Sequence, residues 1–174
     1  MTIQDVPLAA VAALTAFVML SLYDGVVVHF FIERLPTREA ARIEHRLHTA
    51  RALAFPAILV TFFAGRGPAW LGFGLLAIDL MLEVWDMAVE RRSRAHSGGL
   101  LSSEYVVHGL LTTLRATAIT FTIMIDRNRM NTNLLDAFVR LLLPGSIIIA
   151  LAHVALAFPA GRALLGRGRE TVGR

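Results

Sequence analysis

Four carboxylates repeat along one stretch of the chain with the spacing of a single helix face. The stretch 77–92 reads AIDLMLEVWDMAVERR. Its acidic residues are Asp79, Glu83, Asp86 and Glu90. Because an α-helix turns by about 100° per residue, these four positions fall within roughly 60° of one another. The other faces are apolar, and the preceding segment 68–78 carries no charge. Since carboxylates are costly inside a bilayer, this pattern predicts a membrane helix whose acidic stripe faces inward and binds a partner.

Histidine and carboxylate pairs on two other segments extend this chemistry. Glu44 and His48, and likewise Glu104 and His108, are each four residues apart and therefore share a helix face. Carboxylates and imidazoles together are ligands for iron, manganese or zinc. Our first-choice metal ligands are Glu44, His48, Glu83, Asp86, Glu104 and His108. Further candidates, as ligands or as their partners, are Asp24, His29, His45, Asp79, Glu90, Arg115 and His153.

The composition is that of a membrane protein. Of the 174 residues, 56% are hydrophobic, whereas about 45–50% are apolar in a typical soluble domain. The chain has no cysteine, which excludes disulfides and thiolate metal sites. All 17 basic residues are arginines, and they form no block interleaved with aromatic residues. We therefore expect the lipid bilayer, and no nucleic acid, as a partner.

The apolar periodicity and the turn signals divide the chain into five helical segments. The expected helices are Pro7–Ile32, Arg38–Ala64, Ala69–Arg92, Ser102–Ile125 and Asn133–Pro159. We therefore expect an all-α, polytopic membrane bundle of five transmembrane helices, with a four-helix core that carries the polar site. Residues 1–160 would form a single domain, and residues 161–174 an Arg-rich cytoplasmic tail.

The arginines predict how such a bundle is oriented. They gather around the first connection at 33–46, in the third connection at 91–94 and in the tail, whereas the second connection carries only Arg66. By the positive-inside rule, the first and third connections and the C-terminus are cytoplasmic and the N-terminus is outside a bacterial-type inner (plasma) membrane. This topology brings the polar residues of all five helices to the cytoplasmic half.

We expect this convergence to form a site for two divalent metal ions, with iron preferred over zinc or manganese. The construction is similar in outline to the di-metal centres of ferritin-like four-helix bundles, although its pairs are spaced i,i+4 rather than i,i+3. Asp24 and His29 are five residues apart, so both reach one centre only if their helix bulges. Arg115 lies at about the depth of Asp79, which predicts that the two residues pair.

Several functions remain open at this stage. The preferred hypothesis is a metal-dependent oxidoreductase that acts on an apolar or lipid substrate near the cytoplasmic face. The alternatives are a membrane zinc hydrolase, a haem b electron-transfer protein, a proton or cation carrier, and a purely structural ion-pair network without metal. The sequence indicates neither the oligomeric state nor a protein partner.

Overall fold

The computed structural model describes residues 5–33, 35–93, 95, 99, 102–159 and 161, and this part of the chain folds into five helical segments without a strand. The elements are α1 (Val6–Leu22), η2 (Tyr23–Ile32), α2 (Arg42–Ile58), η3 (Leu59–Phe63), α3 (Ala69–Ser93), α4 (Ser102–Ile123) and α5 (Asn133–Ala157). The π-helices η2 and η3 continue α1 and α2 directly. The prediction of an all-α fold with five helical segments is therefore confirmed.

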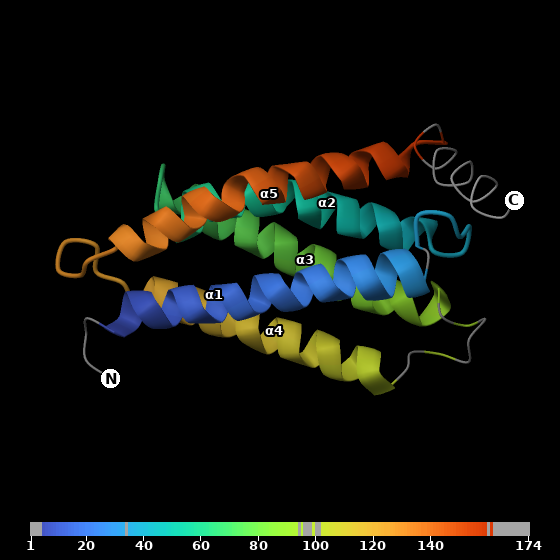
Figure 1. Cartoon of the computed structure of the whole chain (residues 1–174), viewed down its shortest axis with the longest axis horizontal. Coiled ribbons are helices and arrows are strands. Elements are labelled where there is room, and N and C mark those ends of the chain that lie inside the picture. Colours follow the sequence, from blue (N-terminus) through green and yellow to red (C-terminus); the bar gives the residue numbers. More distant parts are fainter. Residues whose placement is uncertain are drawn as a thin grey trace, which may run out of the picture.

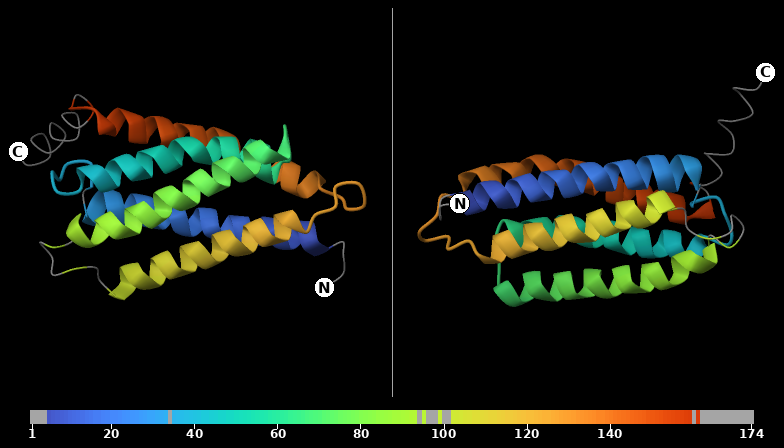
Figure 2. Two further views of the ribbon diagram at one scale, coloured as in Figure 1. Left: turned by 180° about the vertical axis from the view of Figure 1, so that it is seen from behind. Right: turned by 90° about the horizontal axis from the view of Figure 1, so that it is seen from below.

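The helices run along the long axis of a single bundle (Figure 1). Close packing joins α4 to α1, α1 to α5, α5 to α2, and α2 to α3. Figure 2 shows the same bundle from two further sides. Helices α3 and α4 lie at the two ends of this packing order, and polar side chains connect them. Since consecutive helices alternate in direction, the end of η2, the start of α2, the end of α3 and the start of α4 lie together.

An apolar core fills the half of the bundle away from that end. Its most deeply buried large side chains include Leu14, Leu59, Phe63 and Leu135, which come from α1, η3 and α5. Gly72 allows α3 to approach η3 closely, because a Cβ atom there would lie 3.2 Å from the Phe62 Cα atom. The core therefore holds the helices together at one end and leaves the other end to polar residues.

The largest difference from the expected helix boundaries is the start of α2, at Arg42 instead of Arg38. The Arg38 guanidinium donates hydrogen bonds to both the carbonyl and the carboxylate of Glu33. These bonds stabilise a compact turn in which residue 38 precedes the helix. The other ends differ by a few residues at most, and the tail predicted at 161–174 lies, apart from Gly161, outside the described residues.

Three of the helices, not five, are long and apolar enough to cross a membrane by length and composition. They are Val6–Ile32, Ser102–Ile123 and Asn133–Ala157, and they indicate a membrane protein. Of the five expected spans, α2 and α3 do not meet this criterion. In both, charged residues are too frequent: α2 begins RIEHRLHTAR, and α3 carries the acidic stripe. The periodicity predicts that the acidic residues of α3 face inward. A test of length and composition counts every charged residue, whichever way it faces.

Candidate metal centre

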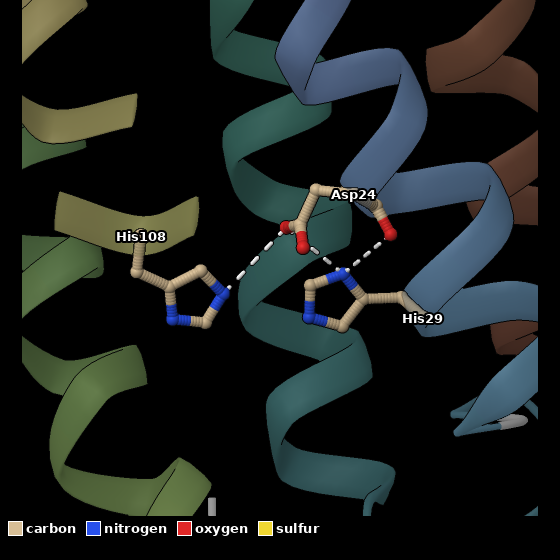
Figure 3. Close-up of side chains that lie close together, drawn as sticks. All are labelled: Asp24, His29 and His108. Atoms are coloured by element: carbon tan, nitrogen blue, oxygen red, sulfur yellow. Dashed lines mark hydrogen bonds and ion pairs between the residues drawn. The ribbon is translucent and has the colours of Figure 1, made fainter. Parts of the chain in front are cut away.

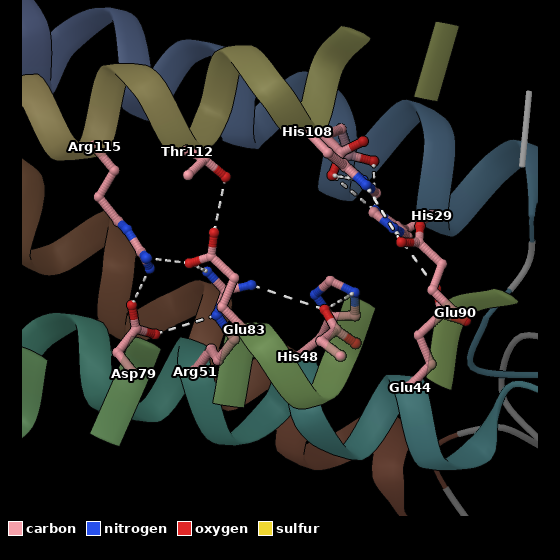
Figure 4. A network of polar contacts seen from close by, with 12 residues as sticks. His29, Glu44, His48, Arg51, Asp79, Glu83, Glu90, His108, Thr112 and Arg115 are labelled. Carbon is pink, nitrogen blue, oxygen red and sulfur yellow. Dashed lines mark hydrogen bonds and ion pairs between the residues drawn. The ribbon is translucent and has the colours of Figure 1, made fainter. Parts of the chain in front are cut away.

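Polar side chains from four helical segments meet at the end of the bundle where η2 ends and α2 begins (Figure 4). The buried acidic and histidine residues of these segments are Asp24, His29, Glu33, Glu44, His45, Asp79, Glu83, Asp86, Glu90 and Glu104. Most of them lie in two regions, one containing histidines and one containing arginines. We call them the histidine cluster (Asp24, His29, Glu44, His48, Asp86, Glu90 and His108) and the arginine layer (Arg51, Asp79, Glu83, Thr112 and Arg115).

The π-helical segment η2 brings Asp24 and His29 together. In an α-helix, residues five apart are about 140° apart around the axis, whereas the i→i+5 turn of a π-helix places them nearly one above the other. His29 Nδ1 lies 3.1 Å from Asp24 Oδ2 and 3.1 Å from the Asp24 carbonyl oxygen (Figure 3). The bulge that the sequence required is thus present, and it moves two second-choice candidates to the centre of the site.

His29 occupies the middle of the histidine cluster. Its Nε2 atom lies 3.9 Å from Glu44 Oε1, on the side of the ring opposite Nδ1. Its ring centre is 4.6 Å from that of His48 and 6.0 Å from that of His108. A side chain from η2 therefore faces α2 through one nitrogen and Asp24 through the other.

Two groups of three ligands overlap at this residue. In each group the ligand atoms lie within 4.8 Å of one another: Asp24, His29 and His108 form one, and His29, Glu44 and His48 form the other. Metal ligands at bond lengths of 2.0–2.2 Å lie about 3–3.5 Å from one another around an ion. The distance of 3.6 Å between Asp24 Oδ2 and His108 Nε2 is close to that range. Small side-chain rotations would therefore bring either group around an ion.

Helix α3 places a carboxylate beside each group, although neither Asp86, a first-choice ligand, nor Glu90 belongs to the groups themselves. Asp86 Oδ2 lies 3.3 Å from His48 Nε2, and Glu90 Oε2 lies 3.3 Å from His108 Nδ1. Both carboxylates are more than nine-tenths buried. Asp86 Oδ1 and Asp24 Oδ1 are buried and accept no hydrogen bond from the described residues. Each group thus has an adjacent buried carboxylate, and two oxygens in the cluster remain available to a ligand.

The arginine layer lies next to the histidine cluster, toward the middle of the bundle. Arg115 forms ion pairs with both Asp79 and Glu83, so the predicted Arg115–Asp79 pair is confirmed. Arg51 lies 3.2 Å from the same two carboxylates, and the Thr112 hydroxyl donates to Glu83. Glu83, a first-choice metal ligand, therefore contacts arginines and Thr112, and belongs to neither ligand group.

Arg51 is the residue that sequence reasoning missed. The sequence analysis gave it no role in the site, yet its guanidinium contacts three carboxylates of α3, including Asp86 at 3.8 Å. Its spacing was an available signal, because Arg51 follows Glu44 by seven residues and His48 by three. These are the intervals of one helix face, and the same reasoning had been applied to Glu44 and His48.

Three other candidates lie at the margin of the cluster. Glu104 is buried beside a small pocket between η2 and α4 that Glu33 also lines, and it belongs to neither ligand group. His45 and His153 stack on each other with ring centres 5.5 Å apart, which connects α2 to α5. His153 is therefore a packing partner in this structure, and α5 supplies none of the grouped ligands.

Comparisons of the chain with known protein families, with curated proteins and with solved structures found no match. The chemistry of the site therefore rests on its own geometry.

Proposed function

We propose that this protein is a membrane metal-dependent oxidoreductase that holds two divalent metal ions in the histidine cluster. The observation that carries the proposal is the pair of three-ligand groups that overlap at His29. Three helical segments, η2, α2 and α4, supply these groups, and α3 adds a carboxylate beside each. Ligands from several helices that converge inside a bundle are the usual construction of di-metal carboxylate centres.

A comparison of the two polar regions supports metal binding over a network of ion pairs alone. In the arginine layer, Asp79 and Glu83 each receive two arginines, and neither has a buried oxygen without a hydrogen-bond partner. In the histidine cluster, Asp24 and Asp86 each keep one such oxygen. Buried carboxylates are normally paired or bound to metal. The four carboxylates of the cluster carry a formal charge that two divalent ions would balance.

We also propose that α2 and α3 lie within the membrane beside the three apolar helices, so that all five cross it. The four carboxylates of α3 face the bundle, whereas its outer surface exposes large apolar side chains. These are Trp70, Phe73, Ile78, Leu80, Met81, Val84, Trp85 and Met87. An apolar surface of this extent on a soluble protein would be an aggregation liability, but it suits contact with lipid.

The surface near the site supports an apolar or lipid substrate. Helices α3 and α4 are joined there by polar side chains rather than by close packing of their backbones. The Thr112 hydroxyl donates to Glu83, and Thr112 also lines a shallow depression on the outer surface of α4. A substrate in the bilayer would therefore approach between α3 and α4, past the arginine layer. Iron would supply the redox chemistry, with molecular oxygen as the oxidant.

The ring arrangement disfavours haem. Two axial histidines of a haem direct a nitrogen at the iron from opposite faces of the porphyrin. The His29 and His108 rings are nearly parallel with centres 6.0 Å apart, but the Asp24 carboxylate lies between them and contacts both. The His29 and His48 ring centres are only 4.6 Å apart. In this arrangement neither pair of rings has room for a porphyrin between them.

The test is metal analysis of protein purified in detergent without chelators, followed by oxygen uptake of the chemically reduced protein. The expected result is two metal ions per chain, with loss of metal in His48→Gln and His108→Gln. His153→Gln is the matched control, because that histidine lies outside both ligand groups. Folded protein that takes up no metal from iron, zinc or manganese solutions would refute the metal centre. A loaded centre that does not react with oxygen would refute the oxidoreductase and leave the hydrolase.

A further inference from the structure

We infer that His29 bridges the two metal ions, binding one through Nδ1 and the other through Nε2. This inference rests on the proposed metal centre and specifies how its two halves are joined. It assigns to one imidazole the role that a carboxylate or a solvent oxygen usually has in a di-metal site. The bridging role follows from three features of the structure: the position of the ring, the ligands around each nitrogen, and the local helix geometry.

The position of the ring is the first feature. Nδ1 of His29 lies 3.1 Å from Asp24 Oδ2, whereas Nε2 lies 3.9 Å from Glu44 Oε1. The two ring nitrogens of an imidazole point in diverging directions, so a single ion cannot accept both. For both ligand groups to bind metal through His29 at the same time, two ions are therefore needed, one at each ring nitrogen.

The second feature is that each side offers enough further ligands. On the Nδ1 side lie Asp24 and His108, with Glu90 3.3 Å from the other nitrogen of His108. On the Nε2 side lie Glu44 and His48, with Asp86 3.3 Å from His48. Either ion would thus have the bridging nitrogen, one imidazole and one or two carboxylates. Nitrogen and oxygen donors of this kind suit zinc, iron and copper.

The third feature is the π-helix. A regular α-helix over Tyr23–Ile32 would rotate Asp24 away from His29, and Nδ1 would lose its neighbouring carboxylate. Single π-turns occur frequently at functional sites, and here the π-helical hydrogen bonding extends over ten residues. Of the two π-helices in the described residues, the longer one thus lies where the proposed bridge needs it.

The geometry also defines the competing arrangements. Nδ1 lies equally close to the Asp24 carbonyl oxygen, so a protonated Nδ1 would donate to Asp24. His29 would then bind a single ion through Nε2, with Asp24 orienting the ring, as is common for metal-bound histidines. A carboxylate-bridged pair would instead place the ions about 3.5–4 Å apart. Bonds of about 2.0–2.1 Å to both ring nitrogens would place them about 6 Å apart.

Copper(II) distinguishes these arrangements, because it binds nitrogen and oxygen sites tightly and carries one unpaired electron. Two copper ions joined by one imidazole couple antiferromagnetically, so their electron paramagnetic resonance signal is lost at low temperature. The experiment loads the full-length protein in detergent with copper(II) and measures bound copper, signal intensity and, by X-ray absorption, the metal–metal distance. We expect two ions per chain, loss of most of the signal, and a separation near 6 Å rather than 4 Å.

Three variants distinguish the bridging role of His29 from the roles of the other ligands. His29→Gln should still bind two copper ions, more weakly, through the remaining residues on each side, and should recover the full signal. His108→Gln should bind one ion with a full signal. His153→Gln, the matched control, should keep the loss of signal, because this residue stacks on His45 outside both groups. The wild-type measurement decides the question even if a variant does not fold.

The outcomes that overturn the bridge differ from those that overturn the metal centre. Two ions with a full signal in the wild type, or a coupled pair at the shorter distance, would refute bridging by His29. One ion per chain would favour the hydrogen-bonded Nδ1 and also refute the bridge. Persistence of coupling in His29→Gln would refute it as well. Absence of copper binding by folded protein would instead refute the proposed function.

Discussion

Arg115→Leu should destabilise the protein, because Arg115 is the shared partner of two buried carboxylates. Its guanidinium contacts Asp79 and Glu83, and the side chains of Arg115 and Asp79 are only 12% and 11% exposed. Removing one member of a buried ion pair costs about 3–5 kcal/mol, because the remaining charge is left without its partner. Arg51 still lies 3.2 Å from each carboxylate. We therefore expect the lower end of this range, about 3 kcal/mol, for the single substitution.

A second substitution tests whether the loss of stability arises because Asp79 is left without Arg115. Combining Arg115→Leu with Asp79→Asn removes one positive and one negative charge, so the net charge of the arginine layer returns to its original value. We expect the pair to show a coupling energy of about 1–2 kcal/mol, within the range measured for contacting residues. Glu83 retains Arg51 and the Thr112 hydroxyl in both variants. Recovery should therefore be partial.

The assay is reversible unfolding in mixed micelles, with the two single variants, the double variant and the wild type forming a double-mutant cycle. Arg129→Leu is the matched control, because Arg129 is 84% exposed and pairs only with the nearby Asp126 among the contacts described. No measurable change is expected there, as for most exposed ion pairs. Strict additivity in the cycle, or an Arg115→Leu effect no larger than that of Arg129→Leu, would refute the reasoning.

Three further predictions concern the membrane and the metal. Both tryptophans of the chain, Trp70 and Trp85, are exposed on α3, so brominated lipids should quench the intrinsic fluorescence; unquenched emission would place α3 outside the bilayer. A reporter fused after Arg174 should be active in the cytoplasm, because arginines concentrate on that side, and exclusively periplasmic activity would invert the proposed topology. Zinc at a hundredfold excess over its dissociation constant should stabilise the wild type by about 2.7 kcal/mol, measured as a rise in Tm. The same zinc concentration should stabilise His48→Gln less, and an equal rise in Tm would argue against His48 as a ligand.

The helical segments could be predicted from the sequence because helix formation depends largely on local information. Apolar periodicity, the Gly65–Pro68 turn and the polar segment before Asn133 all act within a few residues. The alternation of five antiparallel helices then places Asp24, Glu44, Glu90 and His108 at one end of the bundle, whatever the details of packing. Depth along each helix is set by counting residues at 1.5 Å rise, which explains why the Arg115–Asp79 pair was found.

The partners of most site residues could not be predicted in this way, because they depend on how each helix is rotated and which helix lies beside it. Glu83 and Asp86 share one face of α3, yet packing brings Glu83 to Arg51 and Arg115, and Asp86 to His48. A difference of three residues, about one helical turn, decides between an ion pair and a candidate ligand. Such a choice depends on the facing helix, which a single periodic pattern does not describe.

The central position of His29 depended most on tertiary structure. From the sequence, its spacing of five residues from Asp24 argued against a common site, because regular helix geometry separates the two side chains. The π-helix η2 reverses that conclusion, because its i→i+5 turn brings Asp24 and His29 together. The sequence by itself determined that this protein gathers histidines and carboxylates at one end of an apolar bundle. Only the tertiary structure decided which of them meet, because side-chain contacts between helices require the rotation and spacing that long-range packing supplies.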